Sequence, residues 1–284
     1  MNLQPDKSRQ TDKAWERLYG RLERDGLLNE VKEKRYKTGF ISGPALRFAA
    51  SLMIITGATI LLYIGVIDSG RQMVSFSNPD QGSTYVKTLN DGSVVYLAGN
   101  STLSYPDNFR KNSREVALKG EAYFEVAKVE NARFKISTQL AEIEVLGTSF
   151  SVKCHENESS SISVNTGRVR ITHKTSGQTV IAEAGEIVNI EGSGLEKGYS
   201  SESDQFLQYS ARMHFKDESL EHVAEILNRN ISTLKFEILP GIEDRKITAT
   251  FSKESPDSIA ELISLALNLR YLKENDKITI YEVP

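Results

Sequence analysis

The chain has 284 residues, of which 35 are basic and 38 acidic, giving a net charge of −3 with neutral histidines. This balance does not favour binding to nucleic acid through a basic surface. Cys154 is the only cysteine, so an intrachain disulfide is excluded and core packing must hold the folded parts together.

The first predicted element is an amphipathic helix close to the N-terminus. Its apolar residues recur at i, i+3, i+4 and i+7, which places them on one face. They are Trp15, Leu18, Tyr19 and Leu22. Thr11 or Asp12 is expected to cap the start of this helix, and Gly26 to end it.

This helix has little chain around it to pack against. Residues 1–47 precede a long apolar stretch, and a segment this short makes little core of its own. The apolar face therefore predicts binding in a groove on a partner protein. An interfacial helix that lies on a membrane surface is the alternative.

A charge-free stretch, FAASLMIITGATILLYIGVI, runs from Phe48 to Ile67 between Arg47 and Asp68. A helix of this length spans roughly 30 Å, the thickness of the hydrocarbon core of a membrane. We therefore predict a single transmembrane helix over residues 48–67. A buried core helix is the alternative.

The charges on either side of this stretch indicate its orientation. Residues 1–47 carry 11 basic and 7 acidic side chains, or +4, whereas the remainder carries 24 basic and 31 acidic, or −7. By the positive-inside rule, residues 1–47 are expected in the cytoplasm and everything after Asp68 outside.

The next region, residues 80–195, alternates polar and apolar residues with period 2, punctuated by turns. Its clearest signal is a hairpin with Asp91-Gly92 at the tip. Further strands are expected within 114–128, 134–138, 141–154, 161–164, 167–173 and 185–190. The pattern predicts an all-β domain, either a sandwich or a wound solenoid.

A polar stretch over residues 194–212 is interpreted as a linker to a C-terminal α/β domain over residues 210–284. Two segments of that domain, 215–227 and 251–263, resemble each other at an offset of 36 residues. Ser219 and Ser255 are the predicted N-caps of their helices. The expected order is β-α-β-β-α-β-β, in two layers with the helices on one face.

Motifs that carry catalytic chemistry are absent from the sequence. It contains no H-E-x-x-H, G-x-S-x-G or P-loop motif, and no G-x-G-x-x-G after a predicted strand. The four histidines and Cys154 lack metal-ligand spacing. We therefore expect no enzyme, no metal and no cofactor.

Several blocks of the β region resemble, in order, those of the FecR family. They are LNDGSVVYLAGNSTLSYP (89–106), REVALKGEAYFEVAK (114–128), FKISTQLAEIEVLGTSFSVK (134–153), SVNTGRVRI (163–171) and AEAGEIVNI (182–190). The C-terminal α/β region is similar to the domain that follows in many members, which itself is similar to the short N-terminal signalling domain of TonB-dependent transducers and secretins.

The resemblance implies a single-span anti-sigma factor of the bacterial inner membrane, with a cytoplasmic N-terminus and a periplasmic C-terminus. It implies that residues 1–47, here called the head, bind an extracytoplasmic-function sigma factor. The contact residues would be Trp15, Leu18, Tyr19 and Leu22, with Arg17 and Arg21 at the rim. It further implies that the periplasmic C-terminal domain meets the signalling domain of a TonB-dependent outer-membrane transporter, by strand addition at an exposed edge. Direct contact with nucleic acid is not expected.

The block LGTSF contains the Gly147-Thr148 bond, and the resemblance implies self-cleavage there in some members. A threonine hydroxyl would attack the preceding carbonyl to give an ester that water opens. The alternative is a Gly-Thr pair at a strand bend that never reacts, because the motif alone does not supply strain.

Two other functional hypotheses come from different classes. A membrane-tethered module that holds glycan or cell wall through the β domain would have no cytoplasmic output. An anchored hydrolase is the third hypothesis, although no nucleophile–base pair or metal set is visible in the sequence.

Overall fold

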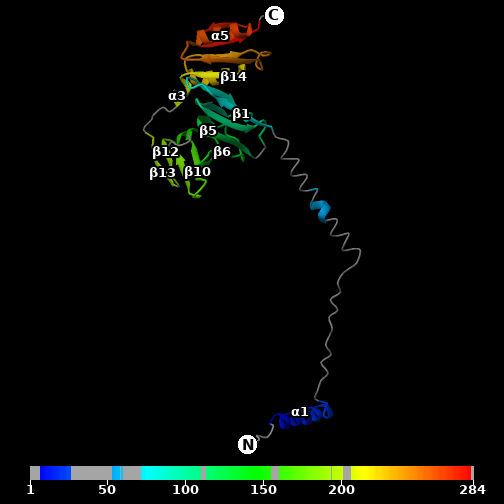
Figure 1. Ribbon diagram of the computed structural model, residues 1–284. Coiled ribbons are helices and arrows are strands. Elements are labelled where there is room, and N and C mark those ends of the chain that lie inside the picture. The colour runs from blue at the N-terminus through cyan, green and yellow to red at the C-terminus, as the bar shows by residue number, and fades with distance from the viewer. Residues whose placement is uncertain are drawn as a thin grey trace. The chain divides into compact units, whose positions relative to one another are not determined.

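The structure is a computed structural model that describes residues 7–26, 53–57, 59, 72–109, 113–154, 160–192, 194–200 and 206–282 (Figure 1). The chain divides into two compact units, Met1–Ile67 and Asp68–Pro284. Each unit is described by itself.

The N-terminal unit contains helix α1, Lys7–Arg24. The predicted start at Thr11 or Asp12 is wrong by about one turn, because the helix begins at Lys7. Its end agrees with the prediction: Gly26 adopts a left-handed φ of 65°, and the Asp25 N–H donates to the carbonyl of Arg21 at 2.9 Å.

The predicted transmembrane helix over residues 48–67 lies largely outside the described residues. Of that stretch, residues 53–57 and 59 are described and are helical. Within the described part of the chain, no helix is long and apolar enough to cross a membrane.

The second unit begins with a β sandwich built from strands β1 to β13. Their bounds are β1 Met73–Asn78, β2 Thr84–Thr88, β3 Val94–Leu97, β4 Ser101–Pro106, β5 Arg114–Glu125, β6 Phe134–Ser137, β7 Ala141–Val145, β8 Ser149–Cys154, β9 Ser160–Thr166, β10 Arg168–His173, β11 Thr179–Glu183, β12 Glu186–Glu191 and β13 Gly194–Tyr199. The predicted hairpin is confirmed, since β2 and β3 pair across the Asp91-Gly92 turn.

The two sheets of the sandwich share strand β5. In the first sheet, the first half of β5 pairs with β4 and β6, and the strand order is β1-β4-β5-β6-β7-β10-β11. In the second sheet, the second half of β5 pairs with β3 and β8, and the strand order is β13-β12-β9-β8-β5-β3-β2. The strand passes from one sheet to the other at Gly120, which has a φ of 93°. A Cβ there would collide with Ser101, so only glycine fits this crossing.

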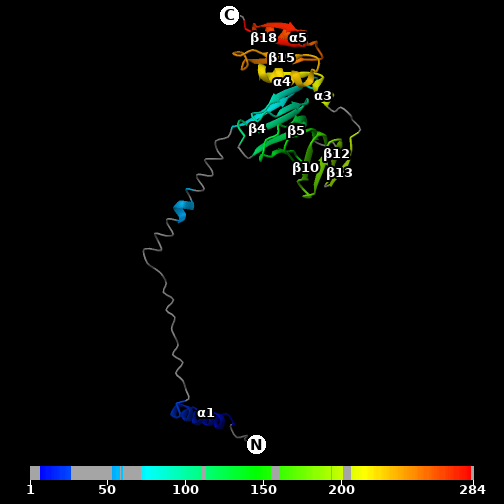
Figure 2. The same ribbon diagram turned by 180° about the vertical axis from the view of Figure 1, so that it is seen from behind.

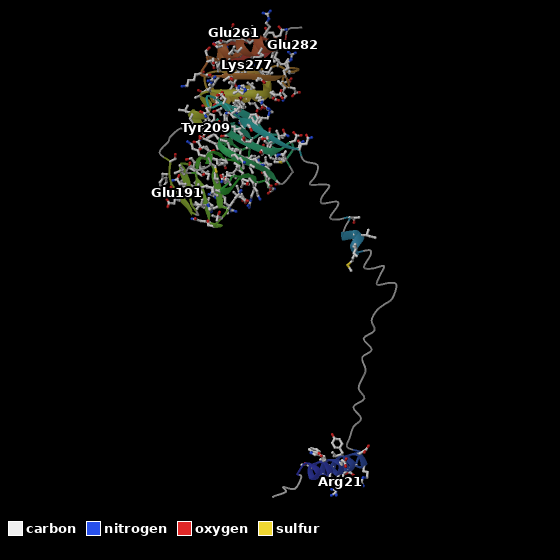
Figure 3. All side chains as sticks on the ribbon, in the orientation of Figure 1. Arg21, Glu191, Tyr209, Glu261, Lys277 and Glu282 are labelled. Carbon is white, nitrogen blue, oxygen red and sulfur yellow. The ribbon has the colours of Figure 1, made fainter. Side chains whose placement is uncertain are left out.

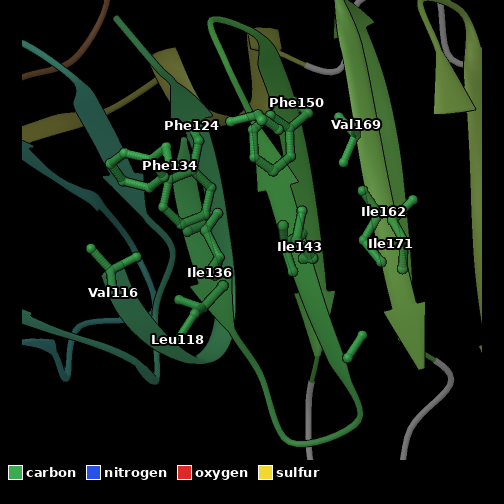
Figure 4. Close-up of a cluster of buried hydrophobic side chains, with 14 of the residues drawn as sticks. Val116, Leu118, Phe124, Phe134, Ile136, Ile143, Phe150, Ile162, Val169 and Ile171 are labelled. Carbon is green, nitrogen blue, oxygen red and sulfur yellow. The ribbon is translucent and has the colours of Figure 1, made fainter. Parts of the chain in front are cut away.

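The core of the sandwich lies between these two sheets (Figure 4). Phe124 and Phe150 stack at a ring-centroid distance of 5.5 Å, and Phe134 packs against Phe124 from the other sheet. The region is therefore a two-layer sandwich rather than a wound solenoid.

The polar stretch 194–212 is more structured than the predicted linker. It opens with β13, which forms a hairpin with β12 from Glu191↔Gly194 to Glu186↔Tyr199. It also includes helix α3, Phe206–Ser210. The linker interpretation is wrong for these residues, because backbone pairing in β13 does not need the apolar alternation on which the prediction depended.

The α/β segment follows, and its element order is the predicted one. It comprises β14 Met213–Ser219, α4 Leu220–Asn230, β15 Lys235–Ile238, β16 Lys246–Phe251, α5 Pro256–Leu267, β17 Arg270–Glu274 and β18 Lys277–Tyr281. The N-caps are also confirmed: the Ser219 side chain accepts from the His222 N–H, and that of Ser255 from the Ser258 N–H.

The packing of the α/β segment differs from the prediction of helices on one face. Strands β14 and β16 pair with each other, whereas β15, β18 and β17 form a separate sheet. Helix α4 contacts β14 and β15, and α5 contacts β16, β17 and β18 (Figure 2). Each helix therefore packs on strands of both sheets.

Strand β14 joins the α/β segment to the sandwich. It pairs in parallel with β2, with Met213 opposite Thr84 and Phe215 opposite Val86. We call this boundary between the sandwich and the α/β segment the seam. One hydrophobic cluster crosses it, in which Tyr96 and Tyr123 of the sandwich lie with Phe215 and the buried faces of α4 and α5.

Polar contacts also tie the seam together. The Tyr209 hydroxyl, labelled in Figure 3, donates to Glu121 at 2.6 Å, and Arg229 pairs with Glu125 at 3.1 Å. Glu218 on β14, only 1% exposed, accepts from Lys87 of β2 at 2.8 Å and pairs with His222 of α4 at 2.9 Å.

Within the Glu218 cluster, the pKa values of Glu218 and His222 shift in opposite directions. Burial alone would raise the Glu218 pKa, but the hydrogen bonds from His222 and Lys87 outweigh it and hold that pKa below its usual value. The hydrogen bond to Glu218 raises the pKa of His222. His222 therefore contributes stability that is present below its unfolded pKa and is lost as pH rises through its folded pKa.

We predict that His222→Gln destabilises the protein more at pH 5.5 than at pH 8.5, as measured by urea unfolding at both pH values. His214 is the matched contrast, because burial lowers its pKa. A loss of stability caused by His214→Gln should become smaller at pH 5.5. An equal effect of His222→Gln at the two pH values would contradict the ion-pair assignment.

Candidate functional site

The predicted stripe on α1 is displayed to solvent. Trp15 is 58% exposed and Tyr19 59%, and Leu18 is also exposed, whereas Leu22 is half-buried. Large apolar side chains that lie together and are exposed to solvent indicate a contact surface for another molecule.

The two arginines predicted at the rim of the stripe differ in position. Successive residues of a helix are about 100° apart. This geometry places Arg21, which Figure 3 labels on α1, beside the stripe. Arg17 lies on the opposite side of the helix from Trp15, so Arg21 is the better placed of the two for a contact that surrounds the stripe.

The Gly147-Thr148 bond lies in the short connection between β7 and β8. Thr148 is buried, its hydroxyl donates to the Arg168 carbonyl at 3.2 Å, and its own carbonyl accepts from the Val126 N–H at 3.0 Å. Gly147 packs against Lys128, where a Cβ would lie 2.8 Å from the lysine Cβ. Close packing therefore explains the glycine at this position.

This geometry does not favour attack by the Thr148 hydroxyl. The backbone of Gly147 lies outside the left-handed region. The hydroxyl would also have to leave the Arg168 carbonyl and lose its proton to a base. The hydroxyl and the carbonyl of Thr148 are thus both hydrogen-bonded within the sandwich.

Arg114 is a buried residue that the sequence analysis did not single out. Its guanidinium donates to Asp91 at 2.8 Å and to the carbonyls of Ala127 at 2.8 Å and Ala132 at 2.7 Å, and it reaches the Leu146 carbonyl at 3.4 Å. It thereby ties the β2–β3 turn to the loop that precedes Gly147-Thr148. The sequence does indicate its burial, because side chains alternate between the two faces of a strand. Arg114 therefore lies on the same inner face of β5 as Val116 and Leu118.

A second set of exposed apolar side chains lies on the α/β segment. Its members are Leu239, Leu262, Leu265, Tyr271 and Leu272. Leu262 and Leu265 lie on the outer side of α5, and Leu265 is 73% exposed. Strand β17 is exposed along its whole length at one edge of its sheet. An apolar surface beside a free strand edge suits a protein partner.

The described residues contain no group of three or more His, Cys, Asp or Glu side chains that could hold a metal ion. Cys154 is buried at the end of β8, where the Ser160 hydroxyl contacts its sulfur at 3.5 Å. Its environment agrees with its interpretation as a small hydrophobic residue of a strand.

Comparison with known proteins relates the sandwich to one family. Residues 80–170 match the family model described as FecR protein. Two crystal structures, at 1.65 and 2.50 Å resolution, of a "putative anti-sigma factor" from Parabacteroides distasonis are similar to the chain. Each is 24% identical to it with a TM-score of 0.46, and the alignments cover 74% and 75% of this chain and 100% of the other. No curated protein matches.

We predict that Thr148→Ala leaves the size of the protein unchanged. An immunoblot of cell extracts with an antibody to the C-terminal end should show the same full-length band for wild type and variant, because the Thr148 hydroxyl is buried and hydrogen-bonded to the Arg168 carbonyl. A shorter fragment that is present in wild type and absent from Thr148→Ala would contradict this prediction.

Proposed function

We propose that this chain, which is of the FecR type with its FecR domain over residues 80–170, is a membrane-anchored anti-sigma factor for an extracytoplasmic-function sigma factor. The family match is the observation that carries the proposal. The exposed stripe on α1 supports it independently, because such a regulator needs a surface on which to capture its sigma factor.

The capture step follows from the chemistry of α1. A partner groove that covers Trp15, Leu18 and Tyr19 removes three large apolar side chains from water, and burial of apolar area drives the association. Tryptophan and tyrosine are among the residues that most often dominate such interfaces. Arg21 adds a charged contact at the rim, which affects the association rate more than the affinity.

The proposed arrangement in the cell uses the apolar stretch over residues 48–67 as a single span of the bacterial inner membrane. The head then lies in the cytoplasm with the sigma factor, and the sandwich and α/β segment lie in the periplasm. The basic flank of residues 1–47 supports this orientation.

The periplasmic signal is proposed to come from a TonB-dependent outer-membrane transporter. Its signalling domain would dock on the α/β segment, at the surface of Leu262 and Leu265 and by strand addition at β17. Because the seam joins the α/β segment to the sandwich through β14 and one shared hydrophobic cluster, a contact on α5 acts on both parts together.

We predict that Trp15→Ala weakens sigma-factor capture by about 2 kcal/mol or more, which is roughly thirtyfold in affinity. The measurement is a pull-down of the host's cytoplasmic extract with tagged full-length protein, in which the retained proteins are identified by mass spectrometry. Lys13→Ala is the matched control, because Lys13 lies on the opposite side of the same helix and alanine preserves helix propensity.

Recovery of one sigma factor by wild type and Lys13→Ala, but not by Trp15→Ala, is the expected result. If wild type retains no sigma factor, the proposal fails and a membrane-tethered periplasmic binding module becomes the better account.

We predict that Leu265→Glu abolishes induction of the sigma-dependent promoter while the protein stays at wild-type level. Leu265 is solvent-exposed, so the charge should disturb docking rather than folding. The measurement is a promoter reporter together with an immunoblot. Leu207→Glu, at another exposed leucine, is the control and should induce normally. Normal induction in Leu265→Glu would show that the transporter contact lies elsewhere.

A further inference from the structure

A groove of about 370 Å³ lies on the outer face of the sandwich. It crosses strands β7, β10 and β11, and its walls include Arg133, Glu144, Leu146, Arg168, Arg170 and Ile181. The strand register explains why these side chains meet. Glu144 pairs with Arg170, and Arg170 with Ile181, so the three form one row across the sheet. We call this feature the arginine groove.

The arginine groove carries an excess of positive charge. Three arginines and one glutamate line it, which leaves its walls with a net charge of +2. Glu144 is shared: Arg133 contacts it at 2.9 Å and Arg170 only at 3.9 Å. Arg168 is paired from outside the groove, with Glu183 at 2.9 Å. Arg170 therefore has donors left for a further carboxylate.

The arginine groove also exposes apolar surface that a small anion would not use. Leu146 is 55% exposed and Ile181 43% exposed. They lie with the arginines around a single hollow, together with the backbone of Gly147 and Thr148. Positive charge and aliphatic side chains in one hollow favour a ligand that carries a carboxylate close to an apolar group.

We propose that the arginine groove binds a peptide segment of a partner protein, in which an acidic residue lies next to a large aliphatic one. The acidic side chain would lie against Arg170, with Arg133 and Arg168 beside it. The aliphatic side chain would cover Leu146 and Ile181. This inference goes beyond the proposed capture of a sigma factor and does not depend on it, because the groove and α1 belong to different units of the chain.

Charge and composition favour a peptide over nucleic acid. The groove has no aromatic side chain among its lining residues on which a base could stack. The whole chain is also acidic, with a net charge of −3. The attraction of the groove is local, so it should be short-ranged and should weaken with salt.

The test is fluorescence anisotropy with full-length protein and a fluorescein-labelled peptide, Gly-Ser-Asp-Leu-Asp-Ser-Gly amide. We expect saturable binding that falls about tenfold when both aspartates are replaced by asparagine, and that weakens when the central leucine is replaced by alanine. Added sodium succinate serves as a competitor and distinguishes a small-anion site from a peptide site.

Variants locate the binding on the protein. Arg170→Gln and Ile181→Ser should each weaken binding about tenfold, whereas Arg170→Lys should retain part of it because the charge remains. Arg212→Gln, at an exposed arginine between α3 and β14, is the matched control and should bind like wild type. A thermal unfolding curve for each variant establishes that it is folded.

Four results would overturn the proposal: no binding at millimolar peptide, equal binding of the aspartate and asparagine peptides, displacement by succinate at micromolar concentration, or equal losses in Arg170→Gln and Arg212→Gln. Sigma-factor capture by Arg170→Gln should match wild type in every case. A failure of the peptide-binding proposal is thereby distinguished from a failure of the anti-sigma proposal.

Discussion

The parallel pairing of β2 with β14 is the backbone contact on which the junction of the sandwich and the α/β segment depends. It extends one sheet of the sandwich into the α/β segment, so the outer face of that sheet becomes the floor of a second core. Tyr96 and Tyr123 are fully buried there although they point away from the first core. The docking proposed on α5 would therefore act on a body that includes the sandwich, through side chains packed in one cluster.

Buried polar groups concentrate where segments distant in sequence must be held together. Arg114 ties the β2–β3, β5–β6 and β7–β8 loops together, and Glu218 joins β2, β14 and α4 at the seam. Each is costly to bury and is offset by charged or backbone partners. In contrast, the surfaces proposed for partners expose apolar side chains: the stripe on α1, the outer side of α5, and the aliphatic residues of the arginine groove.

Local signals in the sequence identified most elements, whereas long-range pairing was missed. The Asp91-Gly92 hairpin and the caps at Ser219 and Ser255 depend on neighbouring residues only, and the structure has all three. The seam depends on the pairing of β14 with β2, which lies some 130 residues earlier in the chain. Local periodicity does not encode a pairing over that distance. The sequence hints at the seam only in β3, whose four residues VVYL are all buried. A strand with one face in solvent would alternate apolar and polar residues, so this run indicates burial on both faces. The stripe on α1 was predictable from its spacing, but the arginine groove was not, because register across three strands assembles it.

The contacts of the seam predict that the sandwich and the α/β segment form one cooperative body. Native-state hydrogen exchange of the full-length protein, followed by mass spectrometry at increasing sub-denaturing urea, tests it most directly. If they do, peptides covering β2 and β14 share one opening free energy and one urea dependence. Phe215→Ala should then lower the opening free energy of the β2 peptides and of the β14 peptides by the same amount. Exchange of residues 213–282 at a distinctly lower free energy, with β2 still protected, would contradict it.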